Sequence, residues 1–274
     1  MTGTRAVIIG GSGRMGRALV RAAREFPVLR LTGVVASAGS DSVGRDAGVL
    51  AGVEPWGLAL TSDLPAALAT ADVAIDFSRP DATRANIAAC RAARRPLLIG
   101  TTGFASHVSE TELDAAARDI PLLIAPNTSL AVALLAALVR TAARALPPEF
   151  DIEIIEAHHR MKRDAPSGTA LALARAAEEG RDPAPAQVLP GAPAVRVGPR
   201  RQGEIGFAVV RGGEIVGEHT VLFAGPGEEL RLSHRAADRA IFARGALKAA
   251  LWLAAQPPGR YDMGDIIHSY QVLR

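Results

Sequence analysis

The 274-residue sequence predicts an α/β protein, with an N-terminal doubly wound parallel sheet and a C-terminal α+β domain whose sheet is mixed and largely antiparallel. In the first half, short runs that are apolar throughout alternate with helical patterns, as in parallel sheets covered on both faces. A glycine-rich turn joins the first apolar run to the first helical pattern. In the second half the runs become mixed apolar and acidic, and a Gly-Gly pair joins two of them.

The first half supplies the elements of the parallel sheet in order. Strands are expected at Arg5–Gly10, Leu29–Ala36, Asp72–Phe77, Pro96–Gly100 and Pro121–Ala125. Helices are expected between them at Arg14–Glu25, Ala82–Arg94 and Glu110–Arg118. Buried strands that alternate with helices give the Rossmann-type arrangement.

The second half predicts a separate domain of helices and antiparallel strands. Helices are expected at Ser129–Leu146, Ser167–Ala177 and Asp238–Ala255, and strands at Asp151–Glu156, Glu204–Arg211, Glu214–Phe223 and Leu230–His234. The Gly212–Gly213 pair predicts that the second and third of these strands form a hairpin, and Arg181–Arg201 is expected to be a loop. The last helix is expected to return to the first domain, so residues 1–127 and 237–274 form one predicted domain and residues 128–236 the other.

Composition excludes several classes of protein. The net charge is +3, from 31 basic and 28 acidic residues without a long basic run, so nucleic acid is not expected as a partner. No apolar stretch reaches the ~20 residues of a membrane helix. Cys90 is the only cysteine, which excludes a disulfide within the chain and favours a cytoplasmic location. Its helical setting favours a buried thiol over a nucleophile.

The glycine-rich turn at Gly10–Gly16 follows the first strand and opens a helix, and it contains G-x-G-x-x-G at Gly11, Gly13 and Gly16. The three glycines permit a tight turn, close approach of a pyrophosphate, and close packing of the helix on the strand. The helix N-terminus adds free N–H groups and partial positive charge. The turn therefore predicts a dinucleotide cofactor; a plain glycine turn is the alternative.

The end of the second strand bears on the choice of cofactor. A dinucleotide fold often has an acid there to hold the ribose hydroxyls, but this chain has none before Asp41. An acid at this place would repel the 2′-phosphate of NADPH, so its absence permits that cofactor. Arg14 could reach such a phosphate. The alternative for Arg14 is a solvated arginine at the start of the helix. Both NADPH and NADH are therefore open, with NADPH or dual use favoured.

Two later strand ends carry small polar residues, Gly100–Gly103 and Ala125–Ser129. Ligands of open parallel sheets bind at the carboxyl ends of the strands, so these segments suit a nicotinamide ribose and ring. Ordinary turns with a helix N-cap are the alternative.

The densest functional stretch runs from Glu156 to Thr169. His158 and His159 end a strand, and Arg160, Lys162 and Arg163 follow them. Ser167-Gly168-Thr169 then opens a helix. Cations and a helix N-terminus suit a small dicarboxylate, and a histidine can supply a proton near neutral pH. A basic surface loop is the alternative. No metal is expected, because adjacent histidines on a strand point to opposite faces.

Four segments together resemble the dihydrodipicolinate reductase family. They are GGSGRMG at Gly10–Gly16, IDFSRP with GTTG at Ile75–Pro80 and Gly100–Gly103, EAHHRMKRDAPSGTA at Glu156–Ala170, and IGFAVVRGGEIVGEHTVLF at Ile205–Phe223. Their order and spacing span nearly the whole chain.

The resemblance implies NAD(P)H-dependent reduction of a cyclic imine dicarboxylate to tetrahydrodipicolinate in lysine and diaminopimelate biosynthesis. It implies catalytic roles for His158 as general acid and Lys162 as second proton donor or electrostatic partner. It implies substrate binding by His159, Ser167, Gly168 and Thr169. It implies cofactor binding by Gly10, Gly11, Ser12, Gly13, Arg14, Met15, Gly16, Phe77, Gly100, Thr101, Thr102, Ala125, Pro126, Asn127 and Thr128. It also implies a homotetramer that associates through the sheet of the substrate domain.

The chain departs from the family pattern at two places. Many members carry an acid and then a basic residue where Ala36 and Ser37 stand, which leaves the cofactor preference open. Many also have phenylalanine and glycine where Thr128 and Ala131 stand. The expected consequence is altered cofactor affinity or domain closure rather than lost chemistry.

Two further hypotheses compete with this reductase. One is a dehydrogenase of the same architecture that acts on another imine or amino acid. The other is a non-catalytic nucleotide sensor. Binding of the dicarboxylate substrate distinguishes the reductase from the other dehydrogenase. Turnover distinguishes the reductase from the nucleotide sensor.

Overall fold

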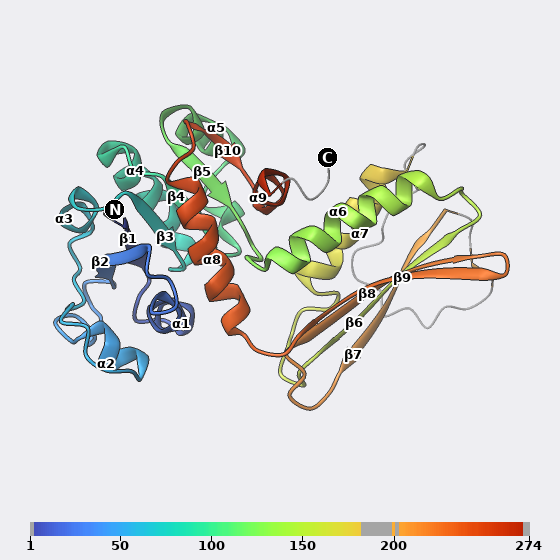
Figure 1. Ribbon diagram of the computed structural model, residues 1–274, viewed down its shortest axis with the longest axis horizontal. Helices are drawn as coiled ribbons and strands as arrows, with labels where there is room; N and C mark the ends of the chain where they lie inside the picture. The colour runs from blue at the N-terminus through green and yellow to red at the C-terminus, as the bar shows by residue number, and fades with distance from the viewer. Residues whose placement is uncertain (1–2, 182–198, 201–202, 271–274) are drawn as a thin grey trace. The chain divides into compact units, whose positions relative to one another are not determined.

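The structure, a computed structural model, describes residues 3–181, 199–200 and 203–270 (Figure 1). Most of the loop expected at Arg181–Arg201 lies outside these residues. Contacts between Cα atoms divide the chain into two compact units, Met1–Ser129 with Ala240–Arg274, and Leu130–Arg239. Each unit has its own sheet.

The first unit is built on a six-stranded sheet. Its strands are β1 (Thr4–Ile9), β2 (Leu29–Val35), β3 (Val73–Asp76), β4 (Leu97–Ile99), β5 (Pro121–Ile124) and β10 (Gly259–Tyr261). All pairs are parallel, in the order β10-β5-β4-β3-β1-β2. The chain therefore reverses its direction of winding at β1, which lies between β2 and β3. The doubly wound parallel sheet is confirmed.

Helices cover both faces of this sheet (Figure 1). The helices of this unit are α1 (Arg14–Ala23), α2 (Ala47–Ala51), α3 (Leu64–Ala69), α4 (Thr83–Ala93), α5 (Glu110–Asp119), α8 (Ala240–Leu253) and α9 (Met263–Ser269), with short 3-10 turns at Pro80–Ala82 and Phe104–Ser106. On one face α8 packs on β3 and β4 and against α1. The other face forms an apolar core with α3, α4 and α5, in which Cys90 is fully buried. Burial raises the pKa of the Cys90 thiol to about 12, so its interpretation as an inert thiol stands.

The second unit is a four-stranded sheet with two helices on one face. The strands are β6 (Asp151–His158), β7 (Ile205–Arg211), β8 (Gly217–Gly225) and β9 (Glu228–Ala236), and the helices are α6 (Leu130–Ala145) and α7 (Gly168–Gly180). The order is β7-β6-β8-β9. β7 is parallel to β6, whereas the pairs β6–β8 and β8–β9 are antiparallel, so the expected mixed, largely antiparallel sheet is confirmed.

The hairpin expected around Gly212–Gly213 is wrong. β6 lies between β7 and β8, and the glycine turn bonds to the end of β6: Gly212 N donates to the His158 carbonyl at 2.9 Å and Arg160 N to the Gly213 carbonyl at 3.2 Å. The hairpin of this unit is β8–β9 instead, with Gly227 at φ +81° in its turn. The two strands that the glycine pair joins therefore lie on either side of β6 instead of against each other.

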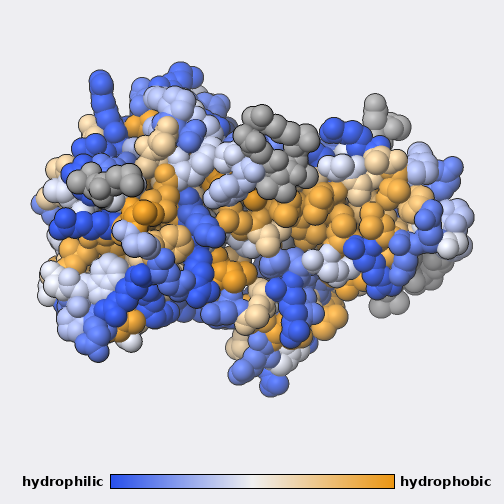
Figure 2. All heavy atoms as spheres, in the orientation of Figure 1, coloured by the Kyte–Doolittle hydropathy of each residue, from blue (hydrophilic) through white to orange (hydrophobic). Residues whose placement is uncertain are grey.

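Side chains alternate along β6, which fixes the two faces of this sheet. Ile152 and Ile154 are buried against α6 and α7, and Glu156 and His158 continue the same face toward the end of the strand. Apolar residues also gather on the surface over α6 in Figure 2. Leu138 of this helix is exposed. Among the described residues, no helix combines the length and apolarity needed to cross a membrane.

Candidate active site

The glycine-rich turn has the geometry expected of a dinucleotide site. Gly10 adopts φ +84°, and a Cβ there would lie 2.4 Å from the Phe77 carbonyl oxygen. A Cβ at Gly16 would lie 2.4 Å from the Gly10 carbonyl oxygen, so only glycine lets α1 start this close to β1. Among the described residues no side chain caps α1, and its first turn contains no acid. The turn therefore leaves a helix N-terminus that suits a phosphate.

The other predicted cofactor segments follow neighbouring strands of the same sheet. Phe77 follows β3, Gly100–Thr102 follow β4, and Ala125–Thr128 follow β5. Backbone hydrogen bonds hold these strand ends side by side. Phe77 N donates to the Ile9 carbonyl at 3.0 Å, Gly100 N to the Asp76 carbonyl at 2.9 Å, and Ala125 N to the Ile99 carbonyl at 2.9 Å. The structure thus brings the predicted segments to one edge of the sheet.

Asp76, the last residue of β3, is a fully buried carboxylate at this edge. It accepts hydrogen bonds from Ser78 N at 2.8 Å, Asn86 Nδ2 at 3.0 Å and Thr101 Oγ1 at 3.2 Å. These bonds tie the segment after β3 to that after β4. Sequence reasoning assigned no role to Asp76, although the family segment IDFSRP contains it.

Thr128 is buried, and its hydroxyl donates to the Phe242 carbonyl of α8 at 2.6 Å. Its side chain is therefore occupied within the first unit. Asn127 Oδ1 accepts from Ser129 N at 2.9 Å, while Pro126 is exposed. Any cofactor contact by Thr128 would thus involve its backbone.

In the second unit, the predicted chemical residues converge on a buried carboxylate. Glu156 is fully buried on β6, and His158, two residues later on the same face, places Nδ1 2.5 Å from Glu156 Oε2. Arg211, the last residue of β7, lies in register with His158 and donates to both Glu156 oxygens at 2.8 Å. Ser167 N donates to Glu156 Oε1 at 3.0 Å. We call Glu156, His158, Ser167, Arg211 and His219 the charged cluster.

His219 completes the charged cluster from β8, where it pairs in register with Glu156. Its ring meets that of His158 edge-on, with centroids 5.0 Å apart and planes at 72°. Its Nε2 lies 3.0 Å from Ser167 Oγ, which also accepts from Ala170 N and so caps α7. His219 therefore links the first turn of α7 to β8.

Burial and nearby charge set the protonation of this cluster. Burial alone would raise the pKa of Glu156, but the hydrogen bonds from Arg211, His158 and Ser167 outweigh it and hold that pKa below its usual range. Burial lowers the pKa of His158, and the nearby Lys162 and Arg211 charges lower it further, against the opposing influence of Glu156. Burial and the neighbouring His158 lower the pKa of His219 to about 4. At neutral pH the cluster thus holds a carboxylate, a guanidinium and two neutral imidazoles.

The loop after β6 carries the remaining predicted residues. Lys162 Nζ donates to both oxygens of Asp164, at 2.9 and 2.8 Å. Arg211 Nη2 also donates to the Asp164 carbonyl at 2.7 Å, which ties this loop to the cluster. His159 is half-buried just beyond the strand, and its carbonyl accepts from Lys162 N at 3.1 Å. The loop thus holds an ammonium close enough to affect the pKa of His158.

α7 begins directly after this loop, with Ser167 as N-cap and Gly168 as its first residue. Gly168 is exposed, and a Cβ there would meet nothing within 4 Å. Thr169 follows, half-buried. The positive end of a 13-residue helix therefore opens beside the charged cluster and suits a carboxylate.

Metal binding is another role that clustered histidines can have. Glu156, His158 and His219 place ligand-type atoms within 4.8 Å of one another. However, Arg211 occupies both carboxylate oxygens, and its charge would repel a cation. The chemistry of the donor set therefore favours an acid–base site.

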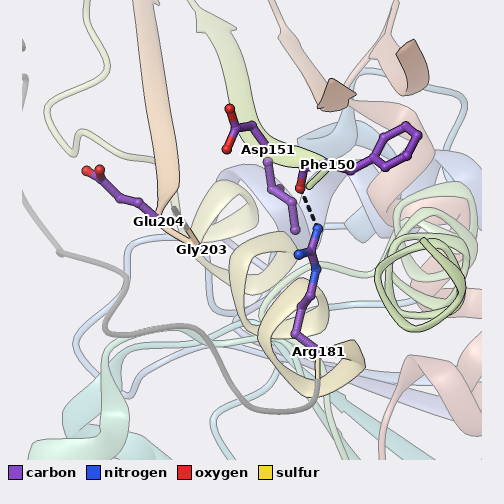
Figure 3. Close-up of a pocket in the computed structure, with 6 residues that line it drawn as sticks. Phe150, Asp151, Arg181, Gly203 and Glu204 are labelled. Carbon is purple, nitrogen blue, oxygen red and sulfur yellow. Dashed lines mark hydrogen bonds between the residues drawn. The ribbon is translucent and has the colours of Figure 1, made fainter. Parts of the chain in front are cut away.

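A small cavity at the opposite end of β6 is unrelated to this chemistry (Figure 3). Its volume is about 10 Å³, room for no more than one water molecule. Arg181 donates to the Phe150 carbonyl there at 2.6 Å. Since β6 spans eight residues, roughly 25 Å of strand separates this cavity from His158.

Comparison with known proteins covers nearly the whole chain. Two family models match, dihydrodipicolinate reductase N-terminus at residues 4–128 and dihydrodipicolinate reductase C-terminus at residues 131–267. The chain is 51% identical over 266 residues to 4-hydroxy-tetrahydrodipicolinate reductase of Alkalilimnicola ehrlichii, covering 96% of this chain and 98% of that protein. It is 47% identical over 264 residues to the enzyme of the same name from Anaeromyxobacter dehalogenans, covering 96% and 97%.

Solved structures are similar in fold. Dipicolinate-bound dihydrodipicolinate reductase from Paenisporosarcina sp. TG-14 matches with a TM-score of 0.77 at 24% identity, over 97% of this chain and 100% of that one. An amine dehydrogenase from Mycobacterium smegmatis matches with a TM-score of 0.67 at 15% identity, over 95% of both chains.

Proposed function

The chain belongs to the dihydrodipicolinate reductase family, and we propose from this premise that it reduces 4-hydroxy-tetrahydrodipicolinate to tetrahydrodipicolinate. This reaction belongs to lysine and diaminopimelate biosynthesis, and the family uses a nicotinamide cofactor. The observation that carries the proposal is the folding of the specific segment Glu156–Ala170 around one buried acid–base cluster.

The edge of the first sheet fits a dinucleotide. Gly10 and Gly16 let α1 begin close to β1, since a Cβ at either position would lie 2.4 Å from a backbone oxygen. The start of α1 has no side-chain cap among the described residues and can receive phosphates. Phe77, Gly100–Thr102 and Ala125–Thr128 line the adjoining strand ends. When bound, a nicotinamide cofactor would supply the hydride that reduces the ring of the cyclic imine dicarboxylate.

The residues of the second unit handle the substrate and its proton. His158 transfers a proton to the ring intermediate, and the Lys162 ammonium stabilises developing negative charge nearby. His159, Ser167, Gly168 and Thr169 hold the carboxylates at the positive end of α7. Loss of water from the hydroxylated ring accompanies reduction, so the product is tetrahydrodipicolinate.

Cofactor preference follows from the end of β2. Ala36 and Ser37 offer no carboxylate to repel a 2′-phosphate. Asp46, further along the chain, caps α2 by accepting from Val49 N at 3.0 Å. Arg14, exposed at the start of α1, can pair with that phosphate. These features support NADPH, or dual use of NADPH and NADH.

A homotetramer through the sheet of the second unit is also proposed. Its outward residues include Ile155, Val210 and Leu222, and Val210 is 48% exposed. The sheet face away from α6 and α7 carries these apolar residues among charged ones such as Glu153 and Glu218, and it suits contact with another copy of the chain. The cytoplasmic location stays a prediction.

Steady-state turnover with NADPH and with NADH, on freshly prepared 4-hydroxy-tetrahydrodipicolinate, tests this function. We expect turnover with at least NADPH, and a fall in kcat/KM of about tenfold to hundredfold in Lys162→Ala and in Thr169→Ala, because each removes a charge-assisted contact. Lys248→Ala, which removes an exposed lysine on α8, is the matched control and should retain full activity.

The same measurements separate the alternatives. Unchanged activity of both site variants on this substrate would favour a dehydrogenase that acts on another imine. Tight NADPH binding with no turnover on any imine dicarboxylate would favour a nucleotide sensor.

A further inference from the structure

Glu156 is the carboxylate closest to the proposed proton donor, yet none of the roles above uses it. We infer that Glu156 is a positioning residue that orients the His158 ring and fixes its tautomer, leaving Nε2 to exchange a proton with the substrate. The inference rests on the proposed function, in which His158 is the general acid.

The tautomer follows from counting hydrogen-bond donors. Glu156 accepts two bonds from Arg211 and one from Ser167 N, so the carboxylate is ionised and has only acceptors to offer. A contact of 2.5 Å to His158 Nδ1 then requires the hydrogen to be on that nitrogen. In the neutral ring, Nε2 is left with a free lone pair.

The orientation of the ring follows from its neighbours on β8. His219 stands edge-on to the His158 ring, with centroids 5.0 Å apart, and so limits its rotation. Gly217, two residues earlier, faces Nε2: a Cβ there would lie 3.1 Å from it. Glycine at this position therefore leaves the Nε2 edge uncovered.

Titratable or charged groups face His158 from every element packed on it. Glu156 comes from its own strand, Arg211 from β7, His219 from β8 and Lys162 from the following loop. Of these, only Glu156 raises the pKa of His158, while Lys162 and Arg211 lower it. Replacing Glu156 by glutamine therefore lowers that pKa further. Because a general acid must be protonated, activity should then be lost at lower pH.

The direct test is NMR of protein labelled with ¹⁵N-histidine, with the His158 ring signals assigned by their loss in His158→Gln. At neutral pH we expect the wild-type ring to carry its hydrogen on Nδ1. In Glu156→Gln we expect a mixed or reversed tautomer and a lower ring pKa. A wild-type ring protonated on Nε2 alone would overturn the inference, whatever the substrate proves to be.

Kinetics provide the second readout. In Glu156→Gln we expect kcat to fall about tenfold or more, with little change in the KM for NADPH and with the decline of activity at high pH moved to lower pH. Glu156→Asp, which keeps the charge, should recover part of kcat. Equal kcat and pH profiles in wild type and Glu156→Gln would overturn the inference.

Two comparisons guard against a purely structural effect. Glu149→Gln, an exposed acid just before β6, should leave the tautomer and kcat unchanged. Gly217→Ala should lower kcat while leaving Nδ1 protonated, since it covers Nε2 without touching Glu156. Failure of the wild type to turn over would instead contradict the proposed function and leave the NMR result to decide the tautomer.

Discussion

The two sheets of the molecule hold their site residues in different ways. At the edge of the parallel sheet, glycines and backbone bonds shape the predicted cofactor segments, and the buried carboxylate of Asp76 accepts from neutral donors. On the helix-covered face of the mixed sheet, an ion pair between Glu156 and Arg211 organises the predicted catalytic residues. The first arrangement suits binding of a large ligand by its phosphates, and the second suits control of one proton. Substitutions in the second unit should therefore act through lost charge pairing, and those in the first unit through lost backbone packing.

The largest effect is expected in the charged cluster. Arg211→Met leaves the fully buried Glu156 without its cation, so the free energy of unfolding at pH 8 should fall by about 3–5 kcal/mol. Glu156→Gln/Arg211→Met should recover most of this loss, since it removes both charges. Urea unfolding of the three proteins checks the prediction, and a loss below about 1 kcal/mol in Arg211→Met would contradict a charge-organised site.

The pH dependence of that loss has a definite sign. The folded-state pKa of Glu156 is lowered, so its contribution to stability is present above the ordinary glutamate pKa and disappears as pH falls through the folded value. The gap between wild type and Arg211→Met should therefore narrow at acid pH. A gap independent of pH would point to lost packing instead of lost charge pairing.

A somewhat smaller effect is expected in the glycine turn. A Cβ at Gly16 would lie 2.4 to 2.8 Å from backbone atoms of Gly10 and Gly11, so Gly16→Ala should cost about 2–3 kcal/mol and weaken NADPH binding. Calorimetry and cofactor titration measure both. Gly39→Ala, where a Cβ meets nothing within 4 Å, serves as the control for stability.

His219 offers a test of intermediate size. Its folded pKa of about 4 lies below the usual histidine value, so the unfolded chain binds its proton first and stability is lost as pH falls from about 6.5 toward 4. Between pH 7 and pH 5 this amounts to about 2 kcal/mol. His219→Gln should show a correspondingly weaker pH dependence of unfolding, and an unchanged slope would mean that His219 is protonated in the fold.

The smallest effect is expected at Thr128. Thr128→Val removes the hydrogen bond to the Phe242 carbonyl and should cost about 1 kcal/mol. Because that side chain is occupied by α8, the KM for NADPH should change less than threefold. A larger change in KM would show that the hydroxyl itself binds the cofactor.

Local pattern was enough to predict the parallel sheet and its glycine turn. Both signals, the uniformly apolar strands and the G-x-G-x-x-G motif, lie in residues that are adjacent in the sequence. The strands and the tight turn that they predict are present in the structure. The three-residue β10 was missed because Gly-Arg-Tyr carries no apolar run.

The charged cluster could be predicted only in part. His158, Lys162 and Ser167 lie in one segment, and Glu156 was visible there without a role. Arg211 and His219 reach it through the register of β7 and β8 with β6, which no local pattern encodes. The mistaken hairpin has the same origin: a Gly-Gly turn indicates a reversal of the chain but cannot show that a third strand enters between its arms.

The separation of cofactor binding from proton transfer is tested most directly by His158→Gln. We predict a dissociation constant for NADPH within twofold of wild type and a fall in kcat of about hundredfold or more on 4-hydroxy-tetrahydrodipicolinate. A kcat within threefold of wild type would contradict the assignment of His158 as the proton donor.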